Sequence, residues 1–374
     1  MKNLKFRFAT ESEQAHDYHV VTSGGMYQDI LIKSDNFEIL EIDGKKALLY
    51  DNNLDKQQAQ LIASDSLGGG AINCALAAAK LDGRVAVMGA IGDDDVGKWV
   101  IHEMKRAGIK FLGEKVVDGA TAKSVVHIDK NGAKFAESYA DLARRLNLKK
   151  SELLQDDKIV LPRTNVLQHS SLGLYNGGLS QSTYEANLQL IKAYESLGQL
   201  PKIVCNFQKS HLNLPKYFEE YLPKVDLIGF NKEEAQIFLD DSSIEDIIEL
   251  QTRILEHPSF KKEAMVLITD GANGVWLKSK DDKHNYFCKS SFDVNVVDTT
   301  GAGDTVLGTM ALNLGYKKHP VLFGLRSGVV NATQNIRILG ANDGQTTRKQ
   351  LNSLVMTYSN QIELKDLNIV EDDI

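Results

Sequence analysis

The sequence predicts an α/β fold in which helices cover both faces of a central, mostly parallel sheet, with a small β-hairpin lid. The first observation is a sustained alternation of short apolar segments and helical patterns from about Asn165 onward. The second is a pair of hairpin signals, Asp43-Gly44 and Asn131-Gly132, which lie outside that alternation. The third is a set of glycine-rich turns between strand and helix, where α/β folds place their ligands.

Composition excludes several classes of protein. The 374 residues are 43% hydrophobic, which is enough for one large domain or two smaller ones. The formal charge of −7 is spread along the chain, so we expect no nucleic-acid partner. Three widely separated cysteines fit neither a disulfide framework nor a zinc site, which favours a reducing cytoplasm. Without a long apolar run, neither secretion nor contact with a membrane is expected.

The N-terminal part is expected to mix strands, hairpins and two helices. Val20–Ser23 reads as a strand before a Gly24-Gly25 turn, and FEILEIDGKKALLYDNN as a hairpin. GGGAINCALAAAK predicts a helix that Asp82-Gly83 ends, before a buried strand over Val85–Ile91. GDDDVGKWVIHEMKRAGIK predicts a second helix with acids at its start, and TAKSVVHID and AKFAESY a second hairpin.

The C-terminal part is expected to follow a strand–turn–helix rhythm. NVLQHSSLGLY, KIVCNF, VDLIGF and AMVLITDG read as strands, with a helix near Ser182 to Leu197. A final strand near Asp293 to Val297 is expected to lead into DTTGAGD, whose apolar tail VLGTMALNLGY begins a helix. PVLFGLRSGVVNATQNI predicts another helix, and KDLNIVEDDI a solvated tail.

The expected domain organisation follows from these elements. A large domain that binds nucleotide and substrate comprises residues 19–32, 66–114 and 141–362. A small discontinuous lid comprises residues 33–65 and 115–140, and residues 1–18 and 363–374 are polar tails.

The turn VVDTTGAGD carries the clearest chemistry in the chain. Its small residues let backbone approach a ligand, and the first N–H groups of the following helix can receive an anion. An aspartate there, Asp304, would repel a phosphate unless it takes a proton from the group that attacks the phosphate. The structural alternative is that Asp304 only caps its helix. Neither the Rossmann pattern G-x-G-x-x-G nor the P-loop pattern is completed.

With these motifs, the sequence resembles the ribokinase-like, or PfkB, family of carbohydrate and nucleoside kinases, which includes adenosine kinases. The resemblance runs from about Val20 to Ala341 and is most specific in DTTGAGD at 298–304. It implies a ribokinase-like fold, Asp304 as catalytic base, and an anion hole formed by the backbone of Gly301, Ala302 and Gly303.

Four further motifs carry the resemblance in the family's order. GGGAINCA implies that Gly69, Gly70 and Asn73 hold substrate hydroxyls, and GGMYQD implies the same for Asp29. NKEEA and ITDGANG imply nucleotide-binding residues, namely Asn231, Glu234, Thr269, Gly271 and Gly274. Each also has a structural reading: Asn73 could begin a helix, Asp29 could cap a turn, and Glu234 could be an exposed helix acid.

The resemblance implies an ATP-dependent kinase that phosphorylates a hydroxymethyl group of a sugar or ribonucleoside. It implies Mg²⁺ bound near Glu234 through water, and a site for K⁺ that uses Asp298 and the loop RILGA at 337–341. Exposed edge strands in the lid could pair with those of a second copy, so a homodimer through the lid is possible.

The sequence also departs from the family pattern. Where many members carry a D-x-N-x-R segment, this chain has CNFQKS, which lacks the arginine; Lys209 could replace it. Val306 stands where phenylalanine is frequent, and Asp82 where a small residue is usual. A kinase of phosphorylated sugars would need a basic clamp, for which Lys33, Lys123 and Arg145 are candidates. A non-catalytic sugar or nucleoside sensor and a nucleotide-dependent oxidoreductase are the rivals from other classes.

Overall fold

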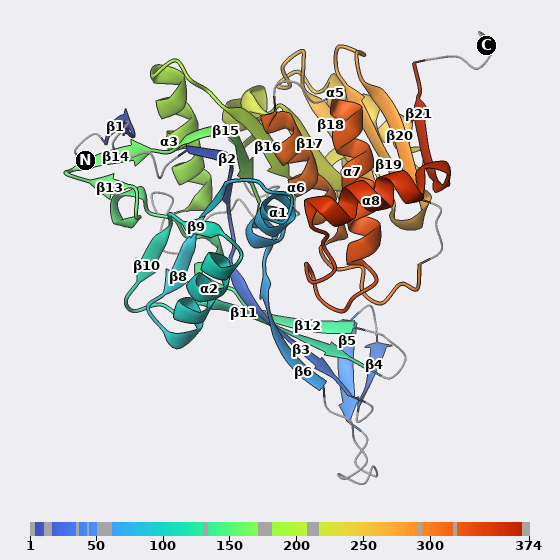
Figure 1. The fold of residues 1–374 in the computed structure, drawn as a ribbon, viewed down its shortest axis with the longest axis horizontal. Coiled ribbons are helices and arrows are strands. Elements are labelled where there is room, and N and C mark those ends of the chain that lie inside the picture. Colours follow the sequence, from blue (N-terminus) through green and yellow to red (C-terminus); the bar gives the residue numbers. More distant parts are fainter. Residues whose placement is uncertain are drawn as a thin grey trace.

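A ten-stranded sheet forms the body of the molecule in the computed structural model (Figure 1). The structure describes residues 4–10, 17–34, 37–42, 45–50, 62–129, 134–170, 182–207, 217–290, 294–316 and 320–368. From one edge to the other, the sheet contains β21 (Ile362–Asp366), β20 (Asn285–Ser290), β19 (Val275–Ser279), β18 (Met265–Thr269), β17 (Leu227–Asn231), β16 (Lys202–Asn206), β15 (Arg163–His169), β2 (Asp17–Ser23), β7 (Val85–Met88) and β9 (Ile109–Phe111).

The sheet is mostly parallel, as predicted. Every neighbouring pair from β9 to β18 is parallel. The three pairs that join β18, β19, β20 and β21 are antiparallel, which makes one edge of the sheet a meander. The predicted strands KIVCNF, VDLIGF and AMVLITDG are therefore confirmed. The antiparallel strands at one edge of the sheet were not predicted.

Side chains from the sheet enter two hydrophobic cores, one on each face. Val20 and Val21 are fully buried neighbours on β2 and belong to different cores. Helices α3 (Thr183–Ser196) and α5 (Ile247–Glu256) pack in the core that contains Val21. The other core receives the helices α1 (Gly70–Ala79), α2 (Asp95–Arg106), α6 (Ala302–Gly315), α7 (Val321–Asn335) and α8 (Arg348–Thr357). Burial on both faces explains why these strands read as continuous apolar runs.

The chain order of the parallel strands reverses at β2. The next two parallel strands in the sequence, β7 and β9, lie on one side of β2, and β15 to β18 lie on the other. In open parallel sheets, ligands bind at the carboxyl ends of the strands beside such a reversal. A ligand site is therefore expected near the turn after β2 and the N-terminal ends of α1 and α6.

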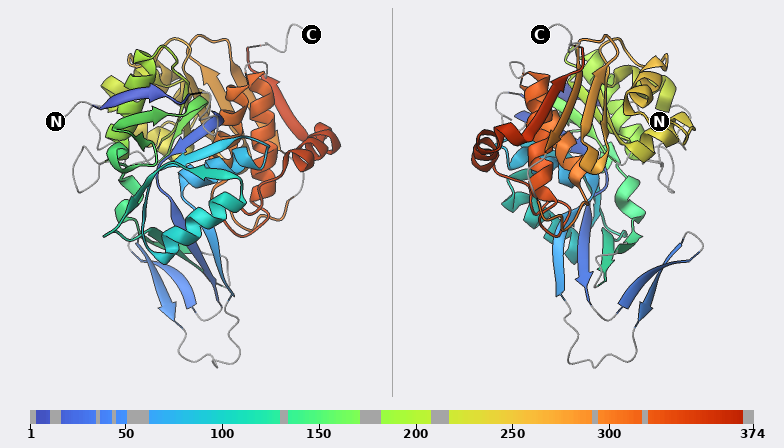
Figure 2. Two further views of the ribbon diagram at one scale, coloured as in Figure 1. Left: turned by 60° about the vertical axis from the view of Figure 1, so that its left-hand side comes forward. Right: turned by 90° about the vertical axis from the view of Figure 1, so that its right-hand side faces the viewer.

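A second sheet of four strands extends from the body (Figures 1 and 2). Its order is β12 (Lys134–Tyr139), β11 (Ala122–Ile128), β3 (Tyr27–Lys33) and β6 (Ile62–Gly68). A separate hairpin, β4 (Phe37–Ile42) with β5 (Lys45–Tyr50), projects beside it. The two predicted hairpins are thus confirmed as β4–β5 and β11–β12. Their turns, Asp43-Gly44 and Asn131-Gly132, lie outside the described residues.

The second sheet begins earlier in the chain than the expected lid boundary. Residues 27–32, expected in the large domain, belong to β3, and residues 66–68 belong to β6. We call this second sheet, made of β12, β11, β3 and β6, the lid sheet. Asp29 therefore lies on the lid sheet, opposite Ser66 and Ser124 on the neighbouring strands.

Three local expectations are wrong. The strand expected over Val85–Ile91 is split at Gly89, and its second part, β8 (Ala90–Gly92), pairs with β10 (Glu114–Val116). A Cβ at Gly89 would lie 2.4 Å from the carbonyl oxygen of Gly24, so the backbone leaves the main sheet where the two turns meet. Of the strand expected near Asp293 to Val297, residues 294–297 are not in a strand. The amides of Val297 and Asp298 instead donate to the carbonyl of Ile336.

The third wrong expectation concerns the polar tails. β1 (Lys5–Phe8) pairs with β14 (Lys158–Leu161), which also pairs with β13 (Leu154–Gln155). At the other end, β21 pairs with β20 across residues 362–366. Both segments alternate in polarity over few residues, so their pairing depends on distant partners. Among the described residues, none of the helices has the length and apolar character needed to cross a bilayer.

Candidate active site

Asp304 lies in the first turn of α6, directly after the glycine-rich turn. Gly301 is the N-cap of the helix and has a φ of 72°, a conformation that glycine adopts without strain. A Cβ at Gly301 would lie 2.0 Å from the carbonyl oxygen of Ala341, so the turn also needs glycine for this close approach. The Thr305 hydroxyl donates to the carbonyl of Gly301 at 2.8 Å, which holds the helix start.

The predicted anion hole is the backbone at this helix start. The Ala302 amide donates to the Thr299 carbonyl at 3.3 Å, a long hydrogen bond. Gly303 is exposed, and a Cβ there would meet no atom within 4 Å. Because the first amides of a helix lack intrahelical acceptors, the N–H groups of Gly303 and Asp304 can receive an anion from this open side.

Two asparagine amides hold the carboxylate of Asp304. Asn73 Nδ2 donates to Asp304 Oδ2 at 2.9 Å, and Asn206 Nδ2 donates to Asp304 Oδ1 at 2.7 Å. Burial raises the pKa of Asp304 to about 6, and the hydrogen bond from Asn73 opposes that rise. Asp304 is therefore a carboxylate that is ionised at neutral pH and accepts a proton more readily than an ordinary aspartate.

Asn73 lies on α1, and the two glycines before it let that helix approach the site. Gly69 has a φ of 91°, and a Cβ there would lie 2.4 Å from the carbonyl oxygen of Gly25. A Cβ at Gly70 would lie 3.2 Å from Ser170 Cβ and 3.5 Å from Asp304 Oδ1. The structure thus brings Gly70, Asn73 and Asp304 together, although 231 positions separate Asn73 from Asp304.

Asp29 lies on β3, beside the strand β6 that leads into α1. A Cβ at Gly68, in the neighbouring strand, would lie 2.0 Å from Asp29 Oδ2, so the carboxylate occupies the space that this glycine leaves free. Burial, then repulsion from Asp298 and Asp343, raises the pKa of Asp29 to about 7. The negative charges of Asp298 and Asp343 therefore act on Asp29, and Asp298 itself belongs to the glycine-rich turn before α6.

The predicted nucleotide residues lie at the carboxyl ends of β17 and β18. Asn231 pairs directly with Thr269 in the parallel register. Together with Gly271 they help to line a surface pocket of about 450 Å³. Glu234 forms a reciprocal capping box with Asn231: the Asn231 side chain accepts from the Glu234 amide at 2.8 Å, and the Glu234 carboxylate accepts from the Asn231 amide at 2.9 Å.

Gly274 has a packing reason as well as its predicted place near the nucleotide. Its φ is 127°, and a Cβ there would lie 2.6 Å from the ring of Phe287. It follows the short helical turn at Gly271–Asn273, which turns the chain back into β19.

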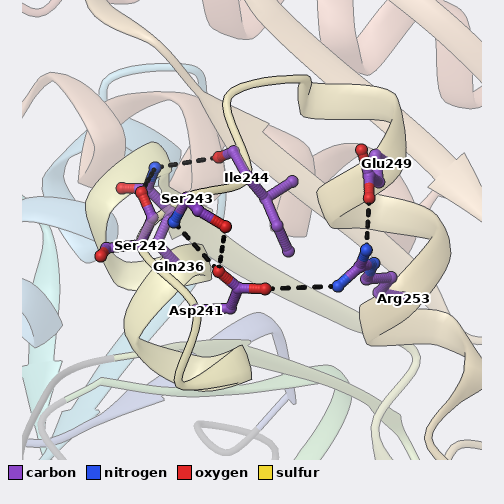
Figure 3. A network of polar contacts seen from close by, with 7 residues as sticks. All are labelled: Gln236, Asp241, Ser242, Ser243, Ile244, Glu249 and Arg253. Carbon is purple, nitrogen blue, oxygen red and sulfur yellow. Dashed lines mark hydrogen bonds and ion pairs between the residues drawn. The ribbon is translucent and has the colours of Figure 1, made fainter.

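A polar network fixes the far end of α4 (Lys232–Leu239), the helix that begins at the nucleotide pocket (Figure 3). Gln236 Nε2 donates to the carbonyl of Ile244 at 2.9 Å, and Asp241 accepts from the Ser243 hydroxyl at 2.6 Å. Arg253 on α5 joins Asp241 at 3.4 Å. These contacts fasten the C-terminal end of α4 to α5.

Asp298 connects the catalytic turn to the loop after α7. It is 3% exposed, and its two oxygens accept from the amides of Thr300 at 2.8 Å and Gly340 at 3.0 Å. The predicted role of Asp298 at a cation site is not tested by these contacts. They do explain why an aspartate is needed at this position of the turn.

The candidate basic clamp receives little support. Arg145 Nη2 lies 2.8 Å from Glu114 Oε1, and both side chains are largely buried. Lys33 is exposed at the end of β3, and Lys123 lies on β11. Lys209, which could replace the missing arginine, lies outside the described residues. Val306 is 2% exposed within the helical core, so it fills a packing position.

Another cavity lies away from these residues. Its volume is about 890 Å³, and it contains residues at the amino ends of β2, β15 and β16 and at the C-terminal end of α6. It includes none of the predicted site residues. Asn206, Asn231 and Thr269 instead lie at the carboxyl ends of their strands, at the opposite edge of the sheet.

Two contacts of this site were absent from the sequence-based prediction. Asn206 was noted only as part of a segment that lacks an arginine, yet its amide contacts Asp304 directly. Asn342, which follows RILGA, donates to Asn73 Oδ1 at 2.8 Å. No local pattern signals either contact, because their partners are 98 and 269 positions away in the chain.

Comparison with known proteins identifies the relatives of this chain. The profile of the pfkB family carbohydrate kinases matches residues 50–321. Fructokinase-2 of Oryza sativa subsp. japonica is 26% identical over 251 residues, which are 66% of this chain and 70% of that protein. Fructokinase of Vibrio alginolyticus is 24% identical over 269 residues, 68% of this chain and 80% of that protein.

Solved structures share the fold. Arabidopsis thaliana ribokinase complexed with ribose and ATP superposes with a TM-score of 0.66, at 20% identity, over 91% of this chain and 99% of that one. Adenosine kinase from Sinorhizobium meliloti superposes with a TM-score of 0.69, at 19% identity, over 90% and 99%. The predicted ribokinase-like architecture is therefore confirmed.

Proposed function

Because the chain belongs to the pfkB family of carbohydrate kinases, we propose that Asp304 is the general base with which it transfers phosphoryl groups from ATP. Sugar kinase activity follows from the family; the roles of individual residues are our proposal. The observation that carries it is the pair of amides, from Asn73 and Asn206, that aims the Asp304 carboxylate beside an open helix start.

In the proposed reaction, the hydroxymethyl oxygen of the substrate attacks the γ-phosphorus of ATP. Its O–H bond breaks and the proton passes to the Asp304 carboxylate, while the new O–P bond forms and the bond to the β-phosphate oxygen breaks. The products are a sugar phosphate and ADP. We propose that the amides at Gly301, Ala302 and Gly303 stabilise the negative charge on the transferred group, mainly through Gly303, because the Ala302 amide already donates to the Thr299 carbonyl.

The pKa of Asp304 suits this role. A base with a pKa of about 6 is ionised at pH 7 and still takes a proton effectively. A non-catalytic sensor would have no need for such a carboxylate at a helix start that receives anions. The contacts of Asp304 therefore favour an enzyme over a sensor.

The acidic surroundings favour an unphosphorylated substrate. Asp29, Asp298 and Asp343 would repel a second phosphate group. Arg145, a candidate clamp, is already paired with Glu114. We therefore propose a neutral sugar or ribonucleoside, whose hydroxyls contact Asp29, Asn73 and the backbone at Gly69 and Gly70, rather than a sugar phosphate. The curated relatives named above are fructokinases, so fructose-like sugars are tested first.

The nucleotide is proposed to bind at the pocket lined by Asn231, Thr269 and Gly271, with Glu234 beside it. Mg²⁺ would neutralise the phosphates of ATP there, with Glu234 contacting it through water. Glu234 fits this use because its carboxylate lies in the first turn of α4, which begins beside this pocket. A monovalent cation, K⁺, is proposed beside Asp298. Gly274 shapes the turn behind the pocket.

Three further expectations remain proposals. They are a homodimer through the lid sheet, a cytoplasmic location, and the absence of nucleic-acid and membrane partners.

A phosphorylation screen tests the function. Purified protein is given ATP, MgCl₂ and KCl with a panel of fructose, ribose, adenosine and fructose 6-phosphate, and products are identified by mass spectrometry. We expect phosphorylation of a neutral sugar or nucleoside and none of fructose 6-phosphate. Binding of a panel member without ADP formation would instead identify a sensor.

A further inference from the structure

Resting on the proposed role of Asp304, we propose that Asn342 is a positioning residue for this base and acts through the side chain of Asn73. Asn342 lies in the loop after α7, and within the described part of the chain its side chain contacts Asn73 and Leu67 but neither Asp304 nor the pocket at Asn231. Its effect is to fix which end of the Asn73 amide faces the catalytic carboxylate.

The contacts form a chain of three side chains. Asn342 Nδ2 donates to Asn73 Oδ1 at 2.8 Å, and Asn73 Nδ2 donates to Asp304 Oδ2 at 2.9 Å. Asn342 Nδ2 also donates to the carbonyl of Leu67. Both asparagines are 4% exposed, so water has little access to replace these partners.

Hydrogen-bond chemistry allows only one direction for this chain. An ionised carboxylate only accepts hydrogen bonds, so Asn73 must turn its NH₂ group toward Asp304. Its carbonyl oxygen then faces Asn342, which must donate. The Leu67 carbonyl also only accepts, and it fixes the NH₂ group of Asn342 on the same side. The orientation of both amides is therefore determined by acceptors at the two ends of the chain.

The backbone that carries Asn342 is held independently of Asn73. Lys80, at the end of α1, donates from Nζ to the Asn342 carbonyl at 2.8 Å, and the Gly340 amide donates to Asp298. Asn335 Nδ2 donates to the carbonyl of Ala341 at 2.9 Å. The loop can therefore present the Asn342 side chain from a fixed position.

Removing the donor at position 342 should leave the Asn73 amide held by Asp304 alone, so that it rotates by half a turn more often. In the rotated state a carbonyl oxygen would face the Asp304 carboxylate, and the base would lose a hydrogen bond that favours its ionised form. The expected consequence is a higher pKa for Asp304 and a less well-placed base.

The deciding test compares Asn342→Asp with Asn342→Ala. Aspartate keeps the shape of asparagine but offers Asn73 an acceptor, which attracts the NH₂ group of Asn73 away from Asp304. We expect Asn342→Ala to lower kcat by about tenfold, Asn342→Asp to lower it further, and KM for ATP to stay within about twofold. If Asn342 only fills space, the aspartate variant would instead be the more active of the two, and the proposal would be wrong.

A second readout does not depend on turnover. The carboxyl ¹³C signal of Asp304, assigned by its loss in Asp304→Asn, is titrated in protein labelled at aspartate. We expect Asn342→Ala to raise the pKa of Asp304 by about one. An unchanged Asp304 titration in a folded Asn342→Ala protein would overturn the proposal, even if no substrate of the wild-type protein had been found.

Asn331→Ala is the matched control. Asn331 is buried, and its Oδ1 accepts from the Thr346 amide at 2.8 Å, so it supports the end of the same loop without touching Asn73. We expect a lower unfolding temperature for Asn331→Ala with an unchanged Asp304 titration. An equal pKa change in both variants would show that general loosening of the loop is responsible, and would contradict a specific role for Asn342.

Discussion

At the scale of single residues, the base is defined by what surrounds its two oxygens. Asp304 accepts from Asn73 on one side and from Asn206 on the other, so its carboxylate cannot rotate without losing a hydrogen bond. The two amides come from α1 and β16, elements that meet only in the folded protein. Positioning of this kind accounts for much of the catalysis expected of phosphoryl-transfer enzymes.

The contact between Asn206 and Asp304 was not predicted from the sequence. Replacing it with alanine removes a 2.7 Å hydrogen bond to the ionised base, so we expect kcat to fall about tenfold or more. The loss of a donor also raises the pKa of Asp304, so the acid limb of the kcat profile should move to higher pH. Steady-state rates between pH 5 and 9 measure both effects.

Asn313→Ala serves as the control for this variant. Asn313 is a buried asparagine at the opposite end of α6 and donates to the Pro320 carbonyl at 3.1 Å. If the acid limb of the kcat profile moved equally in both variants, Asn206 would have no specific effect on Asp304.

Asp29 should make stability depend on pH. Its pKa of about 7 in the folded protein exceeds that of an unfolded aspartate, so ionisation opposes folding. The destabilisation is absent below about pH 4, grows as pH rises, and is complete above about pH 7. We expect Asp29→Asn to unfold a few degrees above wild type at pH 8 and at the same temperature at pH 4. A gain of equal size at both pH values would contradict the assigned pKa.

At the scale of elements, two strands of the lid sheet position Asp29, whose carboxylate is proposed to bind hydroxyls of the substrate. β6 contributes Gly68, which leaves space for Asp29 on β3. A methyl group at position 68 would lie 2.0 Å from Asp29 Oδ2 and force the carboxylate to move. We expect Gly68→Ala to raise KM for the sugar about tenfold or more while KM for ATP changes little.

Gly315→Ala, at the end of α6, is the matched glycine substitution. Its Cβ would find its nearest neighbour, the His19 carbonyl oxygen, at 3.3 Å. An unchanged sugar KM in Gly68→Ala, with the same value as in Gly315→Ala, would show that Asp29 does not hold the substrate.

Helices and strands were predicted correctly where the segment itself contains the residues that define it, such as a helix cap. The prediction failed where a strand depends on a partner that lies far away in the sequence. The helix near Ser182 to Leu197 carries its own cap and is observed as α3. The segment before Asp298 alternates like a strand, yet residues 294–297 form no strand and the turn is tied to the end of α7. β21 was read as part of a polar tail because its partner, β20, lies more than seventy positions earlier.

The same reasoning applies to the site. The motif DTTGAGD was enough to predict a base beside an anion-binding turn, because glycines, an aspartate and a helix start are local features of the sequence. Asn206 and Asn342 act through contacts that only the tertiary fold creates, so neither stood out in the sequence.

At the scale of the whole molecule, the protein joins a ten-stranded sheet to a smaller sheet, which carries Asp29, the residue proposed to bind substrate hydroxyls. Closure of such a lid over the substrate would exclude water from the phosphoryl group of ATP. The body holds Asp304 and the nucleotide pocket, so it should keep its nucleotide when the lid is shortened.

The lid offers a defined place to shorten. Lys33 and Ile62 are paired residues at the ends of β3 and β6, so an Asn-Gly turn can replace residues 34–61 without disturbing the strand register. We expect the shortened protein to hydrolyse ATP faster relative to sugar phosphorylation. ADP release and sugar phosphate formation are measured in the same reaction. A ratio equal to that of wild type would mean that this part of the lid does not exclude water.

The most direct test of the central claim is the single-turnover rate of phosphoryl transfer in Asp304→Asn, with ATP and the best substrate from the screen. Asparagine keeps the size of aspartate but cannot accept the proton, so the rate should fall by roughly 10² to 10⁴ while ATP still binds. A rate within a fewfold of wild type would show that another group removes the proton, and Asp304 would not be the base.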